Sequence, residues 1–572
     1  MKPFNKIVTF LRKVKCNQRL LFVLCVLALS LPNFLLFFID TSPLLVRLCN
    51  IVLPLCIWWW AMTWLRRPGK MFWILFIFVF FDAFQIVLLD MYGGAILAVD
   101  MFLNVATTNA SEIGEQLGGI LPAVTFVFVV YLPLLFLSTV SIYHPSLTRR
   151  FLQLNRRLAT AGIGVGIAML VACYIAVPKF SFINDIYPAN VTDNLIIAIQ
   201  RTVATNNYHN TSRGFTFNAK ATHHANEKEA YILVIGETAR ADNFGVYGYN
   251  RPTTPLLAQE ENLVTYTDVL SQANVTHKSV PMILSAVSAE NFDDIYHQKS
   301  IITAMNEAGF ATAFFSNQRQ NRSFIDFFAA EAHRSVFVKQ NAPSSANIPD
   351  SQLIDYLKEE LADSARCSKR FVVLHTYGSH FNYSDRYPDE ARRFTPDRIT
   401  TIGYKNRQTM VNAYDNSIVS TDMLLHSIIS EARSAGYSAC VVYLSDHGED
   451  IYDDDRRLYM HASPSPSYYQ LHVPLLVWTS ESYEQNHPAE HAALRANVNK
   501  PVASNLVVFH TLLGLSGVST PYAKNAFSLC SPAYSSPKRF YLNDHNDPLP
   551  MDEIGLKHQD LMMLRKQHMQ YP

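Results

Sequence analysis

Five apolar stretches within the first 177 residues constrain this chain more than any other feature of its sequence. Each is long enough to cross the hydrocarbon core of a bilayer, which takes about 20 helical residues. The expected spans are residues 20–39, 48–65, 71–90, 121–143 and 158–177, and four of them contain no charged residue. The first is too long, and too closely followed by the second, for a cleaved signal peptide. We therefore expect an α-helical transmembrane domain with five spans.

The distribution of lysine and arginine predicts the orientation of these spans. Basic residues cluster before the first span, between the second and third (66–70) and between the fourth and fifth (149–157). The three clusters lie on one side of the membrane if all five spans are real, and such clusters favour the cytoplasmic side. We therefore expect a cytoplasmic N-terminus and residues 178–572 on the outer side, which for a bacterial inner-membrane protein is the periplasm.

The composition changes near residue 178, which predicts three regions. Residues 1–177 are the transmembrane domain, 178–228 a periplasmic linker, and 229–572 a soluble domain. Within the linker, residues 193–207 have the pattern of an amphipathic helix, which either lies on the membrane surface or packs as an ordinary helix. Asp82, inside the third span, is either a functional carboxylate or a protonated one that faces a neighbouring helix.

Charge and cysteine content exclude some classes of protein. The net charge of +1 gives no basic field for a nucleic-acid partner. Three cysteines follow residue 178, and they are widely separated: Cys367, Cys440 and Cys530. They form neither a disulfide framework nor a Cys-x-x-Cys metal site.

Short apolar runs rich in β-formers alternate with helical patterns in the soluble domain. The expected buried strands are AYILVIGE (230–237), TAFFSN (312–317), FVVLHTYGSH (371–380), CVVYLSDHGED (440–450) and VPLLVW (473–478). A helical pattern covers residues 408–436 and ends at a glycine. This alternation predicts an α/β domain with a mainly parallel central sheet covered by helices on both faces.

Three of these strands end in residue types that bind metals: Glu237, the pair Asp446 and His447, and His380. The carboxyl ends of parallel strands meet at one edge of a sheet, where ligands gather. Mixed carboxylate and imidazole ligands suit Zn²⁺, with Mn²⁺ as the second choice. A metal there would lower the pKa of a bound hydroxyl.

The candidate nucleophile lies in the segment between the first strand and the next helix. Its hydroxyls are those of Thr276, Ser279 and Ser285, and the residue types alone do not choose among them. The amides at a helix N-terminus favour phosphate oxygens, so this location suits phosphoryl chemistry.

Several motifs together resemble the phosphoethanolamine transferases of Gram-negative bacteria, which belong to the alkaline-phosphatase/sulfatase superfamily and include the lipid A-modifying enzymes that confer polymyxin resistance. The matching segments are VIGETARADNFGVYGYNRPTTP (234–255), THKSVP (276–281), HTYGSHFNYSDRYP (375–388), YDNS (414–417) and SDHGED (445–450). The resemblance covers nearly the whole chain and implies an alkaline-phosphatase/sulfatase-like fold for the soluble domain.

The resemblance also implies a set of site residues. The catalytic zinc would be held by four residues: Glu237, Thr276, Asp446 and His447. Thr276 would be the nucleophile, and His380 and His461 would contact the phosphoryl group or a second zinc. The number of zinc ions, one or two, is not fixed by the resemblance.

Substrate contacts are implied outside this centre. Asn104, Thr108 and Glu112 match the family's N-x₃-T-x₃-E spacing between spans three and four, a loop implicated in holding the lipid headgroup. A lysine that follows the third strand in some members is replaced here by Arg322, whose cationic side chain could still contact phosphate. The chain departs from the better-known members in having Gln272 and Met282 where a disulfide flanks the nucleophile, so packing must hold this loop.

The function implied by the resemblance is transfer of phosphoethanolamine from phosphatidylethanolamine to lipid A phosphate or the lipopolysaccharide inner core, through a zinc-activated, covalent phospho-Thr276 intermediate in a monomeric enzyme. Three rivals are weighed. A phosphodiesterase or sulfatase belongs to the same superfamily, but a sulfatase needs an arginine shortly after Ser279-Val280-Pro281, where none occurs. A lipid-linked glycerophosphate transferase shares the spans and the threonine. A non-catalytic envelope sensor would be expected to lack the metal ligands, but this chain retains them.

Overall fold

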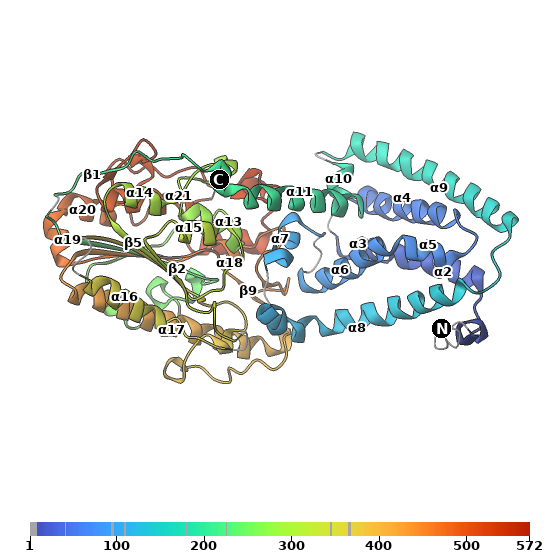
Figure 1. Ribbon diagram of the computed structural model, residues 1–572, viewed down its shortest axis with the longest axis horizontal. Helices are drawn as coiled ribbons and strands as arrows, with labels where there is room; N and C mark the ends of the chain where they lie inside the picture. Colours follow the sequence, from blue (N-terminus) through green and yellow to red (C-terminus); the bar gives the residue numbers. More distant parts are fainter. Residues whose placement is uncertain are drawn as a thin grey trace. The chain divides into compact units, whose positions relative to one another are not determined.

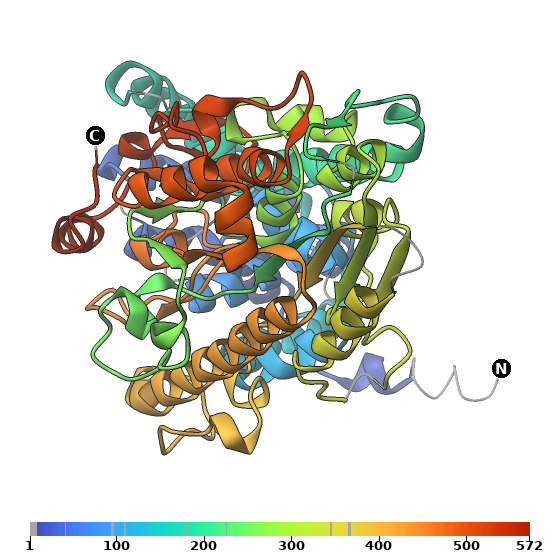
Figure 2. The same cartoon turned by 90° about the vertical axis from the view of Figure 1, so that its left-hand side faces the viewer.

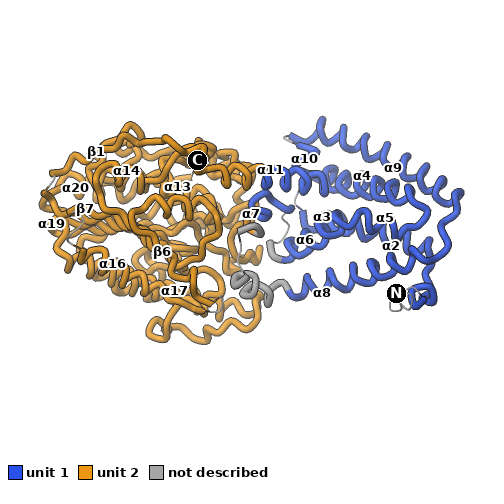
Figure 3. Tube along the Cα trace, in the orientation of Figure 1, with its two compact units in different colours: residues 1–102, 119–199 blue, residues 103–118, 200–572 orange. Residues whose placement is uncertain are grey.

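The computed structural model describes residues 9–40, 42–92, 96–107, 110–178, 180–224, 226–343, 346–363 and 368–571, without the side chains of 91–92 and 105–120. The chain forms two compact units (Figure 3). The first contains residues 1–102 and 119–199, and the second contains 103–118 and 200–572. The predicted division into a membrane domain, a linker from 178 to 228 and a soluble domain stays a prediction.

The first unit is helical. Its longer helices are α2 (Gln18–Leu29), α3 (Leu31–Ile39), α4 (Leu44–Met62), α5 (Pro68–Ile74), α6 (Phe76–Tyr92), the part of α8 (Ala110–Ser141) after residue 118, α9 (Arg149–Ala176) and the start of α11 (Ala189–Asn206). Among described residues, α4, Leu121–Ser141 of α8 and α9 are each long and apolar enough to cross a membrane. The bent pairs α2 with α3 (42°) and α5 with α6 (68°) raise the number to five if each pair is one span.

The positions of these candidate spans agree with the five apolar stretches found in the sequence. The sequence did not predict the bends. Between α2 and α3 the break has a local cause, because Pro32 lies in the first turn of α3 and cannot donate a backbone hydrogen bond to the preceding turn.

Asp82 lies in a buried polar junction of the first unit. The hydroxyl of Tyr187 donates to its Oδ1 over 2.7 Å. The backbone of Tyr187 is held in turn by Asn50, whose Oδ1 accepts from its N–H (3.0 Å), and by Asn33, which donates to its carbonyl (2.9 Å). The Asp82 side chain therefore contacts the turn at Tyr187, and the choice between a functional and a structural carboxylate stays a prediction.

A seven-stranded sheet in the order β3-β11-β8-β2-β7-β5-β6 forms the centre of the second unit (Figure 1). Its strands are β2 (Glu229–Gly236), β3 (Leu263–Tyr266), β5 (Ala311–Ser316), β6 (Arg334–Phe337), β7 (Lys369–His375), β8 (Ser438–Ser445) and β11 (Leu475–Thr479). The strands from β8 to β6 pair in parallel, whereas β11 is antiparallel to both neighbours. The prediction of a mainly parallel sheet is confirmed, with β11 as the reversed strand.

Helices cover both faces of this sheet (Figure 2). One face carries α16 (Gln352–Ala362) and α17 (Arg407–Ser434). Helix α17 corresponds to the helix expected over residues 408–436. The other carries α13 (Thr276–Ile283), α14 (Ile301–Glu307) and α21 (Ser504–Leu515). Alternate residues of β2 point to this second face, because side chains alternate along a strand. Tyr231, Leu233 and Ile235 accordingly join the largest buried apolar cluster.

The parallel strands deliver polar residues to one edge of the sheet. Glu237 follows β2 and Asp446 follows β8, and the two strands are neighbours. The loop after β7 approaches Glu237 closely, since the N–H of Ser379 donates to its carbonyl over 2.9 Å. Gly378 makes this approach possible: its φ is +49°, and a Cβ there would lie 2.6 Å from the Glu237 carbonyl oxygen.

His375, the last residue of β7, should make the stability of the fold sensitive to acid. Its ring is buried, and burial lowers its pKa to about 4. An unfolded chain would bind a proton there near pH 6.5, so stability should be complete above pH 6.5 and fall as the pH drops towards 4. The loss should reach about 3 kcal/mol. Melting temperatures at pH 7.5 and 5 should fall less for His375→Met than for the wild type, and equal falls would contradict the prediction.

Candidate metal centre and nucleophile

Thr276 lies within hydrogen-bond reach of two predicted metal ligands. Its Oγ1 is 3.3 Å from each carboxylate oxygen of Glu237 and 3.1 Å from Nε2 of His447. Thr276 is the first residue of α13, after the N-cap Val275. The backbone N–H groups of a helix's first turn point out of its N-terminus, towards this hydroxyl. The hydroxyl therefore lies beside both carboxylate and imidazole donors and at a helix end that favours anions.

The other two candidate hydroxyls are occupied elsewhere. Ser279 donates to the carbonyl of Asp446 over 2.6 Å and accepts from Asn505 over 2.7 Å. Ser285 donates to the carbonyl of Pro281 over 2.8 Å. Of the three hydroxyls that the sequence left open, Thr276 is the one whose oxygen reaches Glu237 and His447.

Asp446 has one satisfied and one unsatisfied carboxylate oxygen. Its Oδ1 accepts from the backbone N–H of Thr238 (3.1 Å) and of His447 (2.7 Å). Its Oδ2 is buried, lies 3.3 Å from Nε2 of His447, and accepts no hydrogen bond from the described residues. A buried carboxylate oxygen without a donor is costly unless a cation compensates it.

The donor set fits a metal ion. One ligand atom each from Glu237, Asp446 and His447 lie within 4.8 Å of one another, and all three side chains are buried. Two carboxylates, an imidazole and the Thr276 hydroxyl provide the mixed oxygen and nitrogen donors that Zn²⁺ accepts. The structure thus brings together the four residues expected around one zinc.

The pKa shifts of Asp446 and His447 describe the electrostatics of this centre. Burial raises the pKa of Asp446, and the attraction of His447 offsets this only in part. Burial would lower the pKa of His447, but the carboxylates of Asp446 and Glu237 together raise it above its ordinary value. The two shifts have different physical causes: loss of hydration disfavours the charged form of Asp446, whereas the nearby carboxylates favour the charged form of His447.

The two further histidines gather beside His447. Ring centroids of His447 and His461 are 4.3 Å apart, and those of His461 and His380 are 5.9 Å apart. Burial lowers the pKa of His380 to about 4 and that of His461 to about 3, so both rings are neutral near pH 7. Nδ1 of His461 lies 2.8 Å from Oε2 of Glu449, whose pKa burial raises to about 8.

Two residues that contact Glu237 were missed by the sequence analysis. Gln318 donates from Nε2 to Oε2 of Glu237 over 3.2 Å and to the carbonyl of Thr376 over 3.0 Å. Thr238 donates from Oγ1 to the other oxygen of Glu237 over 2.7 Å. Gln318 follows β5, so its position after a central strand was the available signal.

The expected substrate residues have different outcomes. Arg322 lines a cavity of about 260 Å³ together with His277 and Lys278, the two residues after Thr276. Asn104 lies in α7 (Val99–Thr107). Thr108 falls outside the described residues, and for Glu112 only its place in α8 is described. Whether these last three act together stays a prediction.

Hydrogen bonds and packing hold the nucleophile loop without a disulfide. The N–H of Gln272 donates to Oδ1 of Asn505 over 2.6 Å, and the hydroxyl of Ser271 donates to the Asp446 carbonyl over 2.7 Å. Met282 is fully buried in the main apolar cluster. These contacts act where the sequence departs from the better-known members of the family that it resembles.

Comparison with known proteins places the chain in a family. The sulfatase family model matches residues 229–518, which include the residues around Thr276. The chain belongs to the sulfatase family. Members of one family can catalyse different reactions. The individual relatives and solved structures that this chain resembles therefore indicate which reaction to consider.

The curated relatives of this sulfatase-family chain include phosphoethanolamine transferases. EptA of Escherichia coli K12 is 31% identical over 316 residues, which cover 52% of this chain and 55% of that protein. The Kdo(2)-lipid A phosphoethanolamine 7''-transferase of the same strain is 30% identical over 322 residues, covering 54% and 55%. The chain thus matches about half the length of these relatives.

Solved structures extend the likeness in fold to most of the chain. The periplasmic domain of EptC from E. coli, in complex with Zn, has 25% identity and a TM-score of 0.54, covering 60% of this chain and 97% of that one. The integral membrane lipooligosaccharide phosphoethanolamine transferase A of Neisseria meningitidis has 22% identity and a TM-score of 0.73, covering 92% and 100%. The predicted combination of a helical membrane part with a sulfatase-like α/β domain is confirmed.

Proposed function

We propose that this protein transfers phosphoethanolamine from phosphatidylethanolamine to a lipopolysaccharide acceptor, either a lipid A phosphate or the inner core. The observation that carries the proposal is the position of Thr276 Oγ1, 3.3 Å from Glu237 and 3.1 Å from His447. The names of the relatives support phosphoethanolamine as the transferred group. The membrane helices support a lipid donor, because they anchor the chain in a bilayer and so raise the local concentration of lipid substrates.

The metal in this proposal is zinc, held by Glu237, Asp446, His447 and the hydroxyl of Thr276. When bound, it would lower the pKa of that hydroxyl and offset negative charge on the phosphoryl group. The unsatisfied Oδ2 of Asp446 supports a cation at this place, and Mn²⁺ is the alternative ion.

The reaction has two displacements at phosphorus. In the first, the Thr276 hydroxyl gives its proton to the neutral imidazole of His380 or His461, and Oγ1 forms a bond to phosphorus while the bond to the diacylglycerol oxygen breaks. The same imidazole then passes that proton to the diacylglycerol oxygen. In the second, an oxygen of the acceptor attacks phosphorus and Thr276 leaves. The neutral imidazoles of His380 and His461 can accept the proton of an acceptor hydroxyl in this step.

The cavity beside Thr276 supplies a place for an anionic part of a substrate. Its lining combines the cationic side chains of Arg322 and Lys278 with the aromatic rings of Phe292, Tyr296 and Phe324. A guanidinium beside phosphate oxygens is a strong pairing, and the rings suit an apolar neighbour. Arg322 is therefore proposed to bind phosphate.

Arg322→Ala is expected to lower kcat/KM for transfer roughly tenfold to a hundredfold, the effect of one lost charge-assisted hydrogen bond. Transfer from a labelled phosphatidylethanolamine in detergent micelles measures this. Arg319→Ala is the matched control, because Arg319 donates to the carbonyls of Ala342 and Pro343 and does not line the cavity. Equal losses in both variants would remove Arg322 from substrate binding.

Other members of the superfamily are the alternatives. A sulfatase reaction is disfavoured because no arginine follows Pro281 at the required place. A lipid-linked glycerophosphate transferase or a phosphodiesterase would use the same threonine with another donor or with water. The relatives named above favour phosphoethanolamine over both.

Mass spectrometry of envelope lipids tests the proposed function. Bacteria that express the protein should carry added phosphoethanolamine, and fragmentation should locate it on lipid A or on the core. Reporter fusions to the two termini would test the cytoplasmic N-terminus in the inner membrane, and light scattering would test the monomer. An unchanged envelope-lipid profile, with the folded protein present, would contradict the function.

A further inference from the structure

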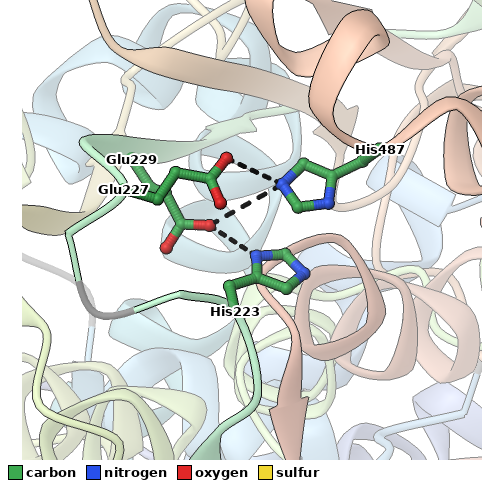
Figure 4. A group of neighbouring side chains, drawn as sticks. All are labelled: His223, Glu227, Glu229 and His487. Carbon is green, nitrogen blue, oxygen red and sulfur yellow. Dashed lines mark hydrogen bonds and ion pairs between the residues drawn. The ribbon is translucent and has the colours of Figure 1, made fainter.

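A second group of metal-binding residue types lies at the opposite end of the sheet from Thr276. Four side chains form it, here called the strand-base cluster: His223, Glu227, Glu229 and His487 (Figure 4). Glu229 is the first residue of β2, whereas Glu237 follows its last. Eight residues of strand span about 26 Å. The strand-base cluster is therefore separate from the catalytic centre.

Short contacts already join the four side chains. Nδ1 of His223 is 2.5 Å from Oε1 of Glu229. Nε2 of His487 is 2.9 Å from Oε1 of Glu227 and 3.9 Å from the same Glu229 oxygen. One ligand atom from each residue lies within 4.8 Å of the other three. All four donors thus face one small volume.

This volume is mostly closed to solvent. The side chain of Glu229 is fully buried, and those of His223, Glu227 and His487 are 11–12% exposed. The two imidazoles stack with centroids 4.0 Å apart and planes inclined by 20°. The stack holds both rings at the cluster, and an imidazole nitrogen is a common ligand of zinc.

The charges leave the cluster suited to a cation. Lys369 pairs with Oε2 of Glu229 over 2.6 Å and neutralises one carboxylate. Oε1 of Glu229 faces His223, and the carboxylate of Glu227 faces His487. The two glutamates and the lysine together carry one net negative formal charge in a mostly buried space, which a bound cation would compensate.

The backbone around His223 is fitted to this arrangement. Thr222 donates from its N–H to the carbonyl of Gly517 over 2.7 Å, which fixes the segment beside β2. Gly517 has a φ of +57°, and a Cβ there would lie 2.2 Å from a ring carbon of His223. A larger residue at 517 would displace the imidazole. Because residue 517 is a glycine, the His223 imidazole can occupy its position in the cluster.

We propose that the strand-base cluster binds a structural zinc ion. Tetrahedral zinc with bonds of about 2.0–2.2 Å holds its ligand atoms roughly 3.3 Å apart. The contacts of 2.5, 2.9 and 3.9 Å bracket that spacing, so small side-chain movements admit the ion. The protein fills all four positions, which is typical of structural sites. The ion would join the segment before β2 to the junction of α19 (Glu481–Asn486) and α20 (Pro488–Ala496).

Zinc content of the purified full-length protein tests this site independently of transferase activity. The double variant Asp446→Asn, His447→Gln removes catalytic ligands and should retain one zinc per chain, measured by mass spectrometry of the metal. Adding His223→Gln and His487→Gln should remove that zinc. If the double variant is folded but free of zinc, or if the added changes leave its zinc in place, the site is overturned.

Two further variants keep the test decisive. Glu227→Gln keeps the shape of a partly exposed side chain, and it should weaken zinc binding at least tenfold in a chelator competition even if the histidine changes impair folding. His426→Gln is the matched control, because His426 contacts Glu260 over 2.6 Å outside any four-donor cluster in the described chain. It should not change the zinc content. An unchanged affinity in Glu227→Gln would assign the contacts to hydrogen bonding alone.

Discussion

Thr276→Ala is expected to abolish phosphoethanolamine transfer, with a loss on the order of 10⁴-fold or more. The substitution removes the oxygen that bonds to phosphorus. The nearby hydroxyls cannot replace it, because Ser279 and Ser285 already donate to the carbonyls of Asp446 and Pro281. Envelope-lipid mass spectrometry, together with transfer from labelled phosphatidylethanolamine, measures the loss.

Two companion variants distinguish a nucleophile from a merely structural residue. Thr276→Ser keeps the hydroxyl and should retain part of the activity, with a covalent phospho-serine detectable at that position by peptide mass spectrometry. Ser279→Ala removes a hydroxyl one turn later on α13 and should cost about 1 kcal/mol of stability while transfer continues. Full activity in Thr276→Ala would overturn the assignment of the nucleophile.

The central strands were predictable because they are buried on both faces. In β2, β5, β7, β8 and β11 every residue is buried, which gives the continuous apolar runs seen in the sequence. The edge strands β3 and β6 are four residues long and partly exposed, so their sequences carry no such run. The direction of β11 was equally hidden, since apolar content does not distinguish parallel from antiparallel pairing.

The site was predictable where a motif stands at the end of a buried strand. Glu237 and the Asp446-His447 pair follow β2 and β8 directly, and strand adjacency then brings them together. Choosing Thr276 from the sequence required the family resemblance, because three hydroxyls fit the pattern. Only the hydrogen bonds seen in the structure distinguish Thr276 from Ser279 and Ser285. Gln318 and the strand-base cluster depend on long-range packing, between β5 and Glu237 and between residues 223 and 487, which local sequence does not encode.

Glu237→Gln is expected to reduce transfer by at least about a thousandfold and to remove the catalytic zinc. The amide keeps the shape of the side chain but loses the charge that faces Thr276 and His447. Chelation of the wild-type protein should abolish its activity and added zinc should restore it. Zinc should not restore Glu237→Gln, because the defect lies in the ligand.

Glu449→Gln is the matched control for this charge. Glu449 is also buried, but its oxygens contact Tyr383 over 2.8 Å and His461 over 2.8 Å rather than Thr276. Burial raises its pKa to about 8, so this carboxyl is mainly protonated near pH 7 and the amide resembles that neutral form. The variant should keep its zinc and lose less activity than Glu237→Gln. If both variants retained zinc and activity alike, the charge of Glu237 would have no part in holding the metal.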